Sequence, residues 1–197
     1  FFNKNMYVQN NAQAVVELKN DIYYDGYFQK NSFVKDVLDD LRSQILIVES
    51  YRANYQNVIN DIEKLEITSI HIRRGDYINV EANRKIFEIC DMNYYSEAMR
   101  IIKSKTNSKK FLIFTQDKEW AAENFKGEEF EIYNGKSAIE DLIMMSHCKH
   151  NIIGNSTFSW WSATLNPNYN KVVIAPTKWD KDKRSLKEFI DEQWIQI

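Results

Sequence analysis

Residues 67–77 read Ile-Thr-Ser-Ile-His-Ile-Arg-Arg-Gly-Asp-Tyr, a short apolar strand that runs directly into two arginines. Open α/β sheets bind their ligands at the carboxyl ends of such strands. The guanidinium groups of Arg73 and Arg74 are planar forks of donors that bind phosphate oxygens and stay charged at any working pH. A solvated basic turn is the alternative interpretation. The second half of the chain favours an anion site.

Short strands and amphipathic helices alternate from residue 67 onward. We expect strands at residues 67–72, 111–114, 130–133, 151–153 and 172–175. This alternation predicts a parallel sheet with helices on both faces. Because crossovers between parallel strands are right-handed, all the strands should end at one edge of the sheet. The predicted fold class is α/β with a Rossmann-like parallel sheet.

Helical spacing dominates the chain before that sheet. We expect a helix that begins at Ser32 and a second helix over residues 51–64. Residues 1–66 therefore read as a mainly helical N-terminal segment, and residues 67–197 as the part that holds the parallel sheet. Further along, Ser137 and Glu140 form a capping-box pattern that predicts another helix start.

Composition excludes several classes of protein. The net charge of −2 and the lack of basic runs argue against nucleic-acid binding. The two cysteines, Cys90 and Cys148, have no paired spacing, so free thiols in a reducing compartment are expected. No apolar run is long enough for a membrane span, and the first residues do not read as a signal peptide. We therefore expect a cytoplasmic protein.

A second polar segment, Gly-Asn-Ser-Thr at residues 154–157, follows the predicted strand at 151–153. Gly154 permits a tight turn, and Asn155 or Ser156 can cap the next helix, whose free amide groups favour an anion. Ser156 and Thr157 add hydroxyl donors. The segment is neither a Walker loop nor a dinucleotide fingerprint. A capped, buried helix is the alternative, but two arginines at the same sheet edge favour a phosphate site.

The sequence resembles the α-1,2-fucosyltransferases of glycosyltransferase family 11. Residues 71–77 match the His-x-Arg-Arg-x-Asp motif that several fucosyltransferase families share, and residues 114–120 match a strand, acidic turn and tryptophan. The most specific match spans residues 140–161, and a weaker one lies at 25–29. The Gly-rich opening usual in the family is absent. The resemblance implies a GT-B glycosyltransferase with its GDP-fucose-binding domain at 67–197.

The family implies further roles for the remaining parts of the chain. Residues 1–66 would be a remnant of the amino-terminal, acceptor-side domain. The reaction would be an inverting transfer of L-fucose from GDP-β-L-fucose to the 2-hydroxyl of a galactoside. Arg73 would bind the β-phosphate, and Arg74 would organise the site or share that contact. No metal or other cofactor is expected, since the arginines supply the positive charge.

Related fucosyltransferases place His71 and Asp117 on the guanine side, where an aspartate accepts from the N1–H and the 2-amino group. Alternatives are a half-buried strand residue for His71 and a helix N-cap for Asp117. Asn155, Ser156 and Thr157 complete the nucleotide-binding residues, with the two hydroxyls on diphosphate oxygens.

Asp76 and Glu81 are the candidates for the general base. Asp76 is alternatively an ion-pair partner of Arg73 or Arg74.

The expected partners are GDP-fucose and a galactose-terminated glycan, with no nucleic acid. The alternative from another functional class is a non-catalytic module that binds guanine nucleotides or nucleotide sugars. A third interpretation is an enzyme of the same fold that uses a different nucleotide sugar. Peripheral association with the inner face of the membrane is a further expectation, resting on the family alone.

Overall fold

A six-stranded, wholly parallel sheet forms the centre of the computed structural model, which describes residues 6–8, 23–25, 30–45, 49–181, 186 and 189–197. The order across the sheet is β5-β4-β3-β6-β7-β8. The strands are β3 (Thr68–Ile72), β4 (Phe111–Thr115), β5 (Phe130–Ile132), β6 (His150–Ile152), β7 (Val173–Ala175) and β8 (Ile195–Gln196). The five predicted strands are confirmed, and β8 is an addition.

The strand order is that of a doubly wound, Rossmann-like sheet. The chain builds outward from β3 through β4 to β5, then returns to the other side of β3 to lay down β6, β7 and β8. The order therefore reverses between β3 and β6, which pair in parallel from Thr68 with His150 to Ile70 with Ile152. Such a reversal leaves a crevice outside the carboxyl ends of the two strands. The predicted fold class is confirmed.

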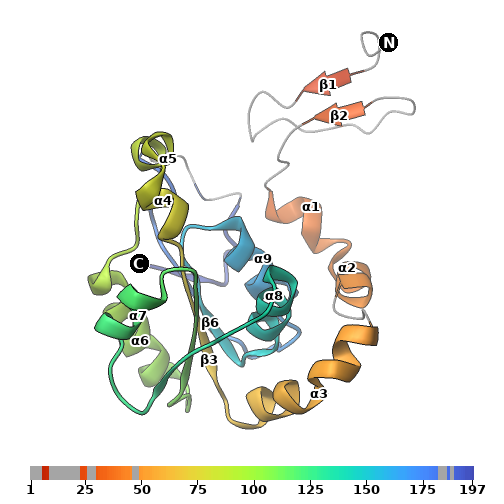
Figure 1. The fold of residues 1–197 in the computed structure, drawn as a ribbon. Coiled ribbons are helices and arrows are strands. Elements are labelled where there is room, and N and C mark those ends of the chain that lie inside the picture. Colours follow the sequence, from red (N-terminus) through yellow and green to blue (C-terminus); the bar gives the residue numbers. More distant parts are fainter. Residues whose placement is uncertain (1–5, 9–22, 26–29, 46–48, 182–185, 187–188) are drawn as a thin grey trace.

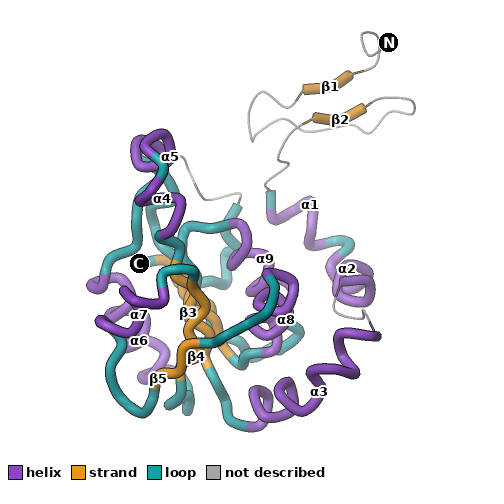
Figure 2. Tube along the Cα trace, viewed as in Figure 1, coloured by secondary structure: helices purple, strands orange, loops and turns teal. Residues whose placement is uncertain are grey.

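Helices cover both faces of the sheet, which Figures 1 and 2 show in cross-section. On one face lie α6 (Met92–Lys105) and α7 (Lys118–Asn124); on the other lie α3 (Glu49–Lys64), α8 (Ala138–His147) and α9 (Thr157–Leu165). The helix predicted over residues 51–64 and the helix start predicted at Ser137 are confirmed. Ser137 Oγ accepts a hydrogen bond from the backbone N–H of Glu140, at 3.2 Å.

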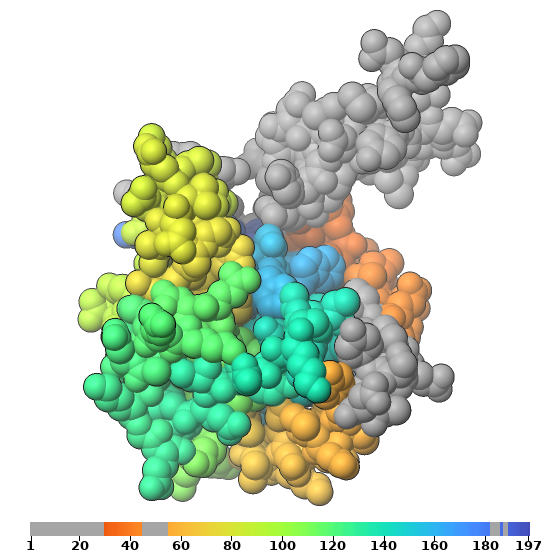
Figure 3. Space-filling view, in the orientation of Figure 1, coloured from red at the N-terminus to blue at the C-terminus, as the bar shows by residue number. Residues whose placement is uncertain are grey.

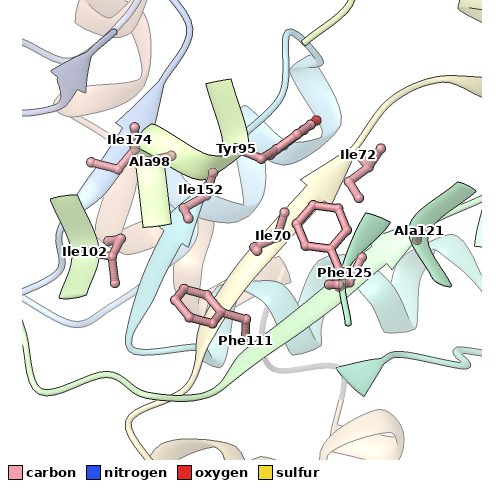
Figure 4. Packing of buried hydrophobic residues seen from close by; sticks show 11 residues of the cluster. Ile70, Ile72, Tyr95, Ala98, Ile102, Phe111, Ala121, Phe125, Ile152 and Ile174 are labelled. Atoms are coloured by element: carbon pink, nitrogen blue, oxygen red, sulfur yellow. The ribbon is translucent and has the colours of Figure 1, made fainter. Parts of the chain in front are cut away.

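The side chains of strand β4 alternate between the hydrophobic clusters on the two faces of the sheet. Phe111 and Ile113 belong to the cluster on the α6 side, together with the residues drawn in Figure 4. Leu112 and Phe114 point the other way, into the cluster that includes Ile59 of α3. Every second side chain of a strand faces the same layer, so a two-sided apolar strand must be covered on both faces.

The N-terminal segment differs in detail from its prediction. The helix expected from Ser32 is two helices, α1 (Asn31–Lys35) and α2 (Leu38–Ile45), and Phe33 is partly exposed instead of buried. Val34 of α1 packs in the cluster beside α9. Strands β1 (Met6–Val8) and β2 (Tyr23–Asp25) form a separate parallel pair. The division at residue 66 stays a prediction, and most of the match at 25–29 lies outside the described residues.

The turns after β3 and β6 approach each other closely. A Cβ atom at Gly154 would lie 3.2 Å from the carbonyl oxygen of His71 and 3.8 Å from the amide nitrogen of Arg73. That carbonyl is held in place, because the Tyr95 hydroxyl donates to it at 3.2 Å. The neighbouring Tyr94 hydroxyl donates to the carbonyl of Ile153 at 2.5 Å. Two tyrosines of α6 thus fix the edge at which the strand order reverses.

We expect Gly154→Ala to lower the free energy of unfolding by about 1–3 kcal/mol, because the new methyl group overpacks a backbone that cannot retreat. Urea denaturation measures the loss. Tyr169→Ala is the control, since Tyr169 is 93% exposed and its replacement should cost less than about 0.5 kcal/mol. Equal stability of the two variants would show that the turns can move apart.

Candidate active site

A cleft of about 150 Å³ lies at the carboxyl ends of β3 and β4, where the strand order predicts a ligand site. The turns after β3 and β4 line it together with residues of α8 and α9, so the predicted meeting of strand ends at one edge is seen here. The residues that line the cleft are His71, Ile72, Arg73, Arg74, Gly75, Phe114, Thr115, Gln116, Ala138, Asp141 and Phe158. Because Phe158 lies in the first turn of α9, the start of that helix reaches the same cleft as the arginine pair.

Arg73 lines the cleft, and its side chain is held by contacts with Asp76 and Tyr77. Its guanidinium donates to Asp76 Oδ2 at 2.9 Å and lies 5.5 Å from the ring centre of Tyr77. The Tyr77 hydroxyl in turn donates to the carbonyl of Asn155 at 3.0 Å, which joins the turns after β3 and β6. The predicted pairing of Asp76 with an arginine is confirmed. The Arg73 side chain remains 31% exposed, so donors are left for an anion.

Arg74 is held more firmly. Its Nε donates to Asp117 Oδ2 at 3.1 Å, and its guanidinium carbon lies 4.2 Å from the ring centre of Trp120. The other carboxylate oxygen of Asp117 accepts from the backbone N–H of Trp120 and caps α7. Arg74 is thereby oriented by α7, in keeping with the organising role expected for it. The N-cap alternative for Asp117 is confirmed, and its guanine contact stays a prediction.

His71 is buried, at 6% exposure, and faces Phe158 with 5.6 Å between the ring centres. Burial, and then the positive charge of Arg73, lower the pKa of His71 from its ordinary 6.5 to about 3. The imidazole is therefore neutral at physiological pH. Its Nδ1 is buried without a hydrogen-bond partner in the described part of the chain. A buried polar atom left unpaired at a cleft wall is suited to a ligand.

Asp141 is a site residue that the sequence reasoning missed. It lines the cleft, and its Oδ1 is buried with no hydrogen-bond partner among the residues described. Burial, and then the charge of Glu140, raise the pKa of Asp141, while Lys118 opposes them. Two sequence signals pointed to it: its place in the first turn after the capping Ser137, and its position within the family match at residues 140–161. The Asp141 side chain therefore lines the cleft, while its unpaired Oδ1 is buried against Gly135.

Glu140 explains why its neighbour faces the cleft. Its carboxylate points the other way, into the protein, and is 3% exposed. It accepts hydrogen bonds from the hydroxyl of Tyr55 at 2.8 Å and from that of Tyr133 at 2.7 Å. Tyr55 lies in α3 and Tyr133 directly after β5, so contacts from two other parts of the fold fix the rotation of α8 and with it the position of Asp141.

The turn before α9 differs partly from expectation. Ser156 occupies the N-cap position, but its side chain makes no capping hydrogen bond. The buried Asn155 does not cap the helix either, because its amide donates to the carbonyls of Glu88 and Trp179. The expected side-chain caps are therefore wrong. The first amide groups of α9 are left for an anion, and the diphosphate roles of Ser156 and the exposed Thr157 stay predictions.

The two candidate bases lie in different surroundings. Asp76 sits beside Arg73, and its Oδ1 is buried without a partner among the described residues. Glu81 begins α5 (Glu81–Ile86), on the lobe that α5 forms with α4 (Gly75–Asn79). Its side chain is 71% exposed, pairs with Lys85 at 2.7 Å and does not line the cleft. Neither carboxylate lines the cleft, but Asp76 is connected to it by the ion pair with Arg73, whereas Glu81 pairs with Lys85 on α5.

The part of the chain that the structure describes contains neither a metal-binding cluster nor a membrane-spanning helix. There, no group of three or more His, Cys, Asp or Glu side chains is placed to hold a metal ion. The sequence contains one Asp-x-Asp pair, at residues 180–182. Asp180 is buried and forms an isolated β-bridge with Phe87, and residue 182 lies outside the described part of the chain. Metal independence stays a prediction. No described helix is long and apolar enough to cross a membrane.

Comparison with known proteins places this geometry in context. The sequence profile of "Glycosyl transferase family 11" matches residues 7–197. The O-antigen biosynthesis glycosyltransferase WbnK of Escherichia coli is 33% identical over 195 residues, covering 92% of this chain and 63% of that protein. An alpha-1,2-colitosyltransferase of Escherichia coli is 32% identical over 189 residues, 91% of this chain and 64% of that protein.

More distant relatives include galactoside alpha-(1,2)-fucosyltransferase 1 of Saimiri boliviensis boliviensis, which is 25% identical over 146 residues. That match covers 68% of this chain and 40% of the relative. No solved structure matches the chain. The chain spans less than two thirds of the length of each of these relatives.

The buried His71 makes stability depend on pH. Its pKa is lower in the folded state, so the unfolded chain binds the proton first and stability falls as the pH drops below 6.5 toward 3. At pH 5.5 this linkage should cost about 1.4 kcal/mol relative to pH 7.5. Urea denaturation should show a loss that is larger in the wild type than in His71→Gln by about 1.4 kcal/mol. His150, whose pKa burial also lowers, is present in both proteins and cancels. An equal loss in both would mean that His71 is already protonated in the folded state.

Proposed function

Because this chain belongs to glycosyltransferase family 11, we propose that it binds GDP-β-L-fucose and transfers L-fucose, with inversion, to the 2-hydroxyl of a galactoside. One observation carries the proposal. A partly exposed Arg73 and the uncapped start of α9 reach the same cleft, at the reversal point of the sheet. Positive charge and free amide groups at that point suit a diphosphate.

The chemistry follows from where charge develops. As the bond between C1 of fucose and the β-phosphate oxygen breaks, negative charge grows on that oxygen, and Arg73 stabilises it. Arg74, held by Asp117 and Trp120, keeps the turn in place and adds to the field. Preorganised charge of this kind is worth about 3–4 kcal/mol of the barrier. No divalent metal is required in this scheme.

The acceptor side of the reaction needs a base. The acceptor oxygen bonds to C1 on the face opposite the leaving phosphate, and its proton passes to a carboxylate. Of the two predicted candidates we favour Asp76, because its unpaired Oδ1 lies beside Arg73, while Glu81 stands exposed on α5.

Guanine recognition falls to the inner wall of the cleft. We assign His71 and Asp117 to guanine as the resemblance implies, and we add Asp141, which lines the cleft. Asp117 does not line this cleft itself but lies beside it, where its carboxylate accepts from Arg74. A carboxylate that accepts from the N1–H and the 2-amino group separates guanine from adenine. The unpaired Oδ1 of Asp141 supports this role. Asp117 already accepts two hydrogen bonds, but a carboxylate has about four lone-pair sites.

Two alternatives remain within reach of experiment. Transfer of colitose in place of fucose is favoured by the relative that is named for that sugar. The other is a module that binds guanine nucleotides or nucleotide sugars without turnover. For the active enzyme we propose a cytoplasmic location, with a galactose-terminated glycan acceptor at the inner face of the membrane.

Calorimetry tests the nucleotide site. We expect GDP to bind in the presence of a chelator, and ADP and UDP to bind at least tenfold more weakly, because neither offers the guanine donors. Arg73→Ala should abolish GDP binding, since it removes the diphosphate contact. Arg100→Ala is the matched control, because Arg100 is exposed on α6 and pairs only with Glu97 among the described residues. ADP or UDP binding as tightly as GDP would refute the guanine assignments.

Turnover separates the enzyme from the module. With GDP-fucose and lactose, the enzyme should release GDP and form a fucosylated product, and Asp76→Asn should lower kcat by at least about a hundredfold. GDP-colitose in the same assay tests the second donor. Absence of transfer and of donor hydrolysis with both sugars, in a chain that binds GDP, would establish the module instead.

A further inference from the structure

A second and larger cleft, of about 420 Å³, adjoins the nucleotide cleft. We call it the α4–α7 cleft, after the two helices that border it. It is lined by Gly75, Ile78, Asn79, Gln116, Asp117, Lys118 and Glu119. In the space-filling view, the α4 residues in yellow lie directly above the green residues of the β4–α7 turn. Its volume is within the roughly 300–1,000 Å³ of small-molecule sites.

The two clefts meet at a single point. Gly75 and Gln116 line both of them. A Cβ atom at Gly75 would lie 3.2 Å from Gln116 Oε1, so the Gln116 amide rests against the glycine and stands between the clefts. Asp117, which lines the α4–α7 cleft, is also the ion-pair partner of Arg74. The α4–α7 cleft therefore opens beside the arginine pair, to which the proposed function assigns the diphosphate.

The lining of the α4–α7 cleft selects a class of ligand. It offers two amides and two carboxylates but a single aliphatic side chain, that of Ile78. The ammonium group of Lys118 is drawn away, because it donates to Asn134 Oδ1 at 2.5 Å. No aromatic ring lines the cleft, which disfavours a base, and Glu119 disfavours a further anion. Closely spaced donors and acceptors without net positive charge suit the hydroxyl groups of a sugar.

We propose that the α4–α7 cleft binds the sugar unit that accepts the transferred residue, with Asn79 and Glu119 holding its hydroxyl groups and Gln116 at the junction. This inference rests on the proposed function and adds a subsite to it. The transferred sugar leaves a phosphate held at Arg73, so its acceptor must approach from beside the arginine pair. The junction at Gly75 and Gln116 opens there. The domain that holds the donor thus also contacts the acceptor.

The test measures lactose binding to the full chain saturated with GDP, by saturation-transfer NMR titration. Asn79→Ala and Glu119→Ala should each weaken lactose binding at least tenfold, because each removes hydrogen bonds to the sugar. Both variants should bind GDP within twofold of the wild type, which also shows that they are folded. Glu123→Ala is the matched control: Glu123 is an exposed carboxylate on α7 that does not line the cleft.

The outcomes separate the two proposals. GDP binding with lactose affinity lost in both variants, but kept in Glu123→Ala, supports the subsite. GDP binding without lactose binding, or with lactose affinity equal in all variants, overturns the subsite and leaves the proposed function intact. Failure of the wild type to bind GDP overturns the proposed function, and lactose titration without nucleotide still decides whether the α4–α7 cleft holds a sugar.

Discussion

The close approach of two turns, those after β3 and β6, is the constraint on which the site depends. A glycine at 154 allows the contact, and the tyrosine hydroxyls of α6 hold the carbonyl groups on both sides of it. Without it, the arginine pair and the start of α9 would belong to separate surfaces. Because the two turns are in contact, the positive charge after β3 and the free amide groups at the start of α9 face the same cleft. Both sources are fixed before any ligand arrives, which is the condition for effective electrostatic stabilisation.

The two arginines are neighbours in sequence but are held in different ways. Arg74 is fixed between a carboxylate and an indole ring, so little of its freedom remains to be lost on binding. Arg73 has one carboxylate partner and more exposure, so it can exchange water for phosphate oxygens. An Arg-to-Lys change at either position would keep the charge but lose the planar fork. The two arginines differ because their contacts differ. Arg73 pairs with Asp76, whereas Arg74 pairs with Asp117 and lies over the ring of Trp120.

Sequence reasoning succeeded where local pattern and structure agree. The strands, the doubly wound class, the pairing of Asp76 and the cap at Asp117 all follow from spacing and from residues next to one another. It failed where the outcome depends on contacts between distant segments. Asp141 looked like any acidic residue of a helix start, and only the hydrogen bonds from Tyr55 and Tyr133 to Glu140 decide which of the two carboxylates faces the cleft. Likewise, Asn155 was expected to cap α9, but its side-chain amide donates instead to the carbonyls of Glu88 and Trp179.

The exposure of Gln116, Lys118 and Glu119 has an evolutionary consequence. Their side chains rest on the rim of the sheet and contribute little to the apolar layers beneath, so substitutions among them should change folding free energy by less than about 0.5 kcal/mol. Selection can then vary this rim while the buried strands stay under stricter control. A scaffold of this kind separates the residues that keep it folded from those that set its preferences, and so allows new specificities to arise by small, tolerated steps.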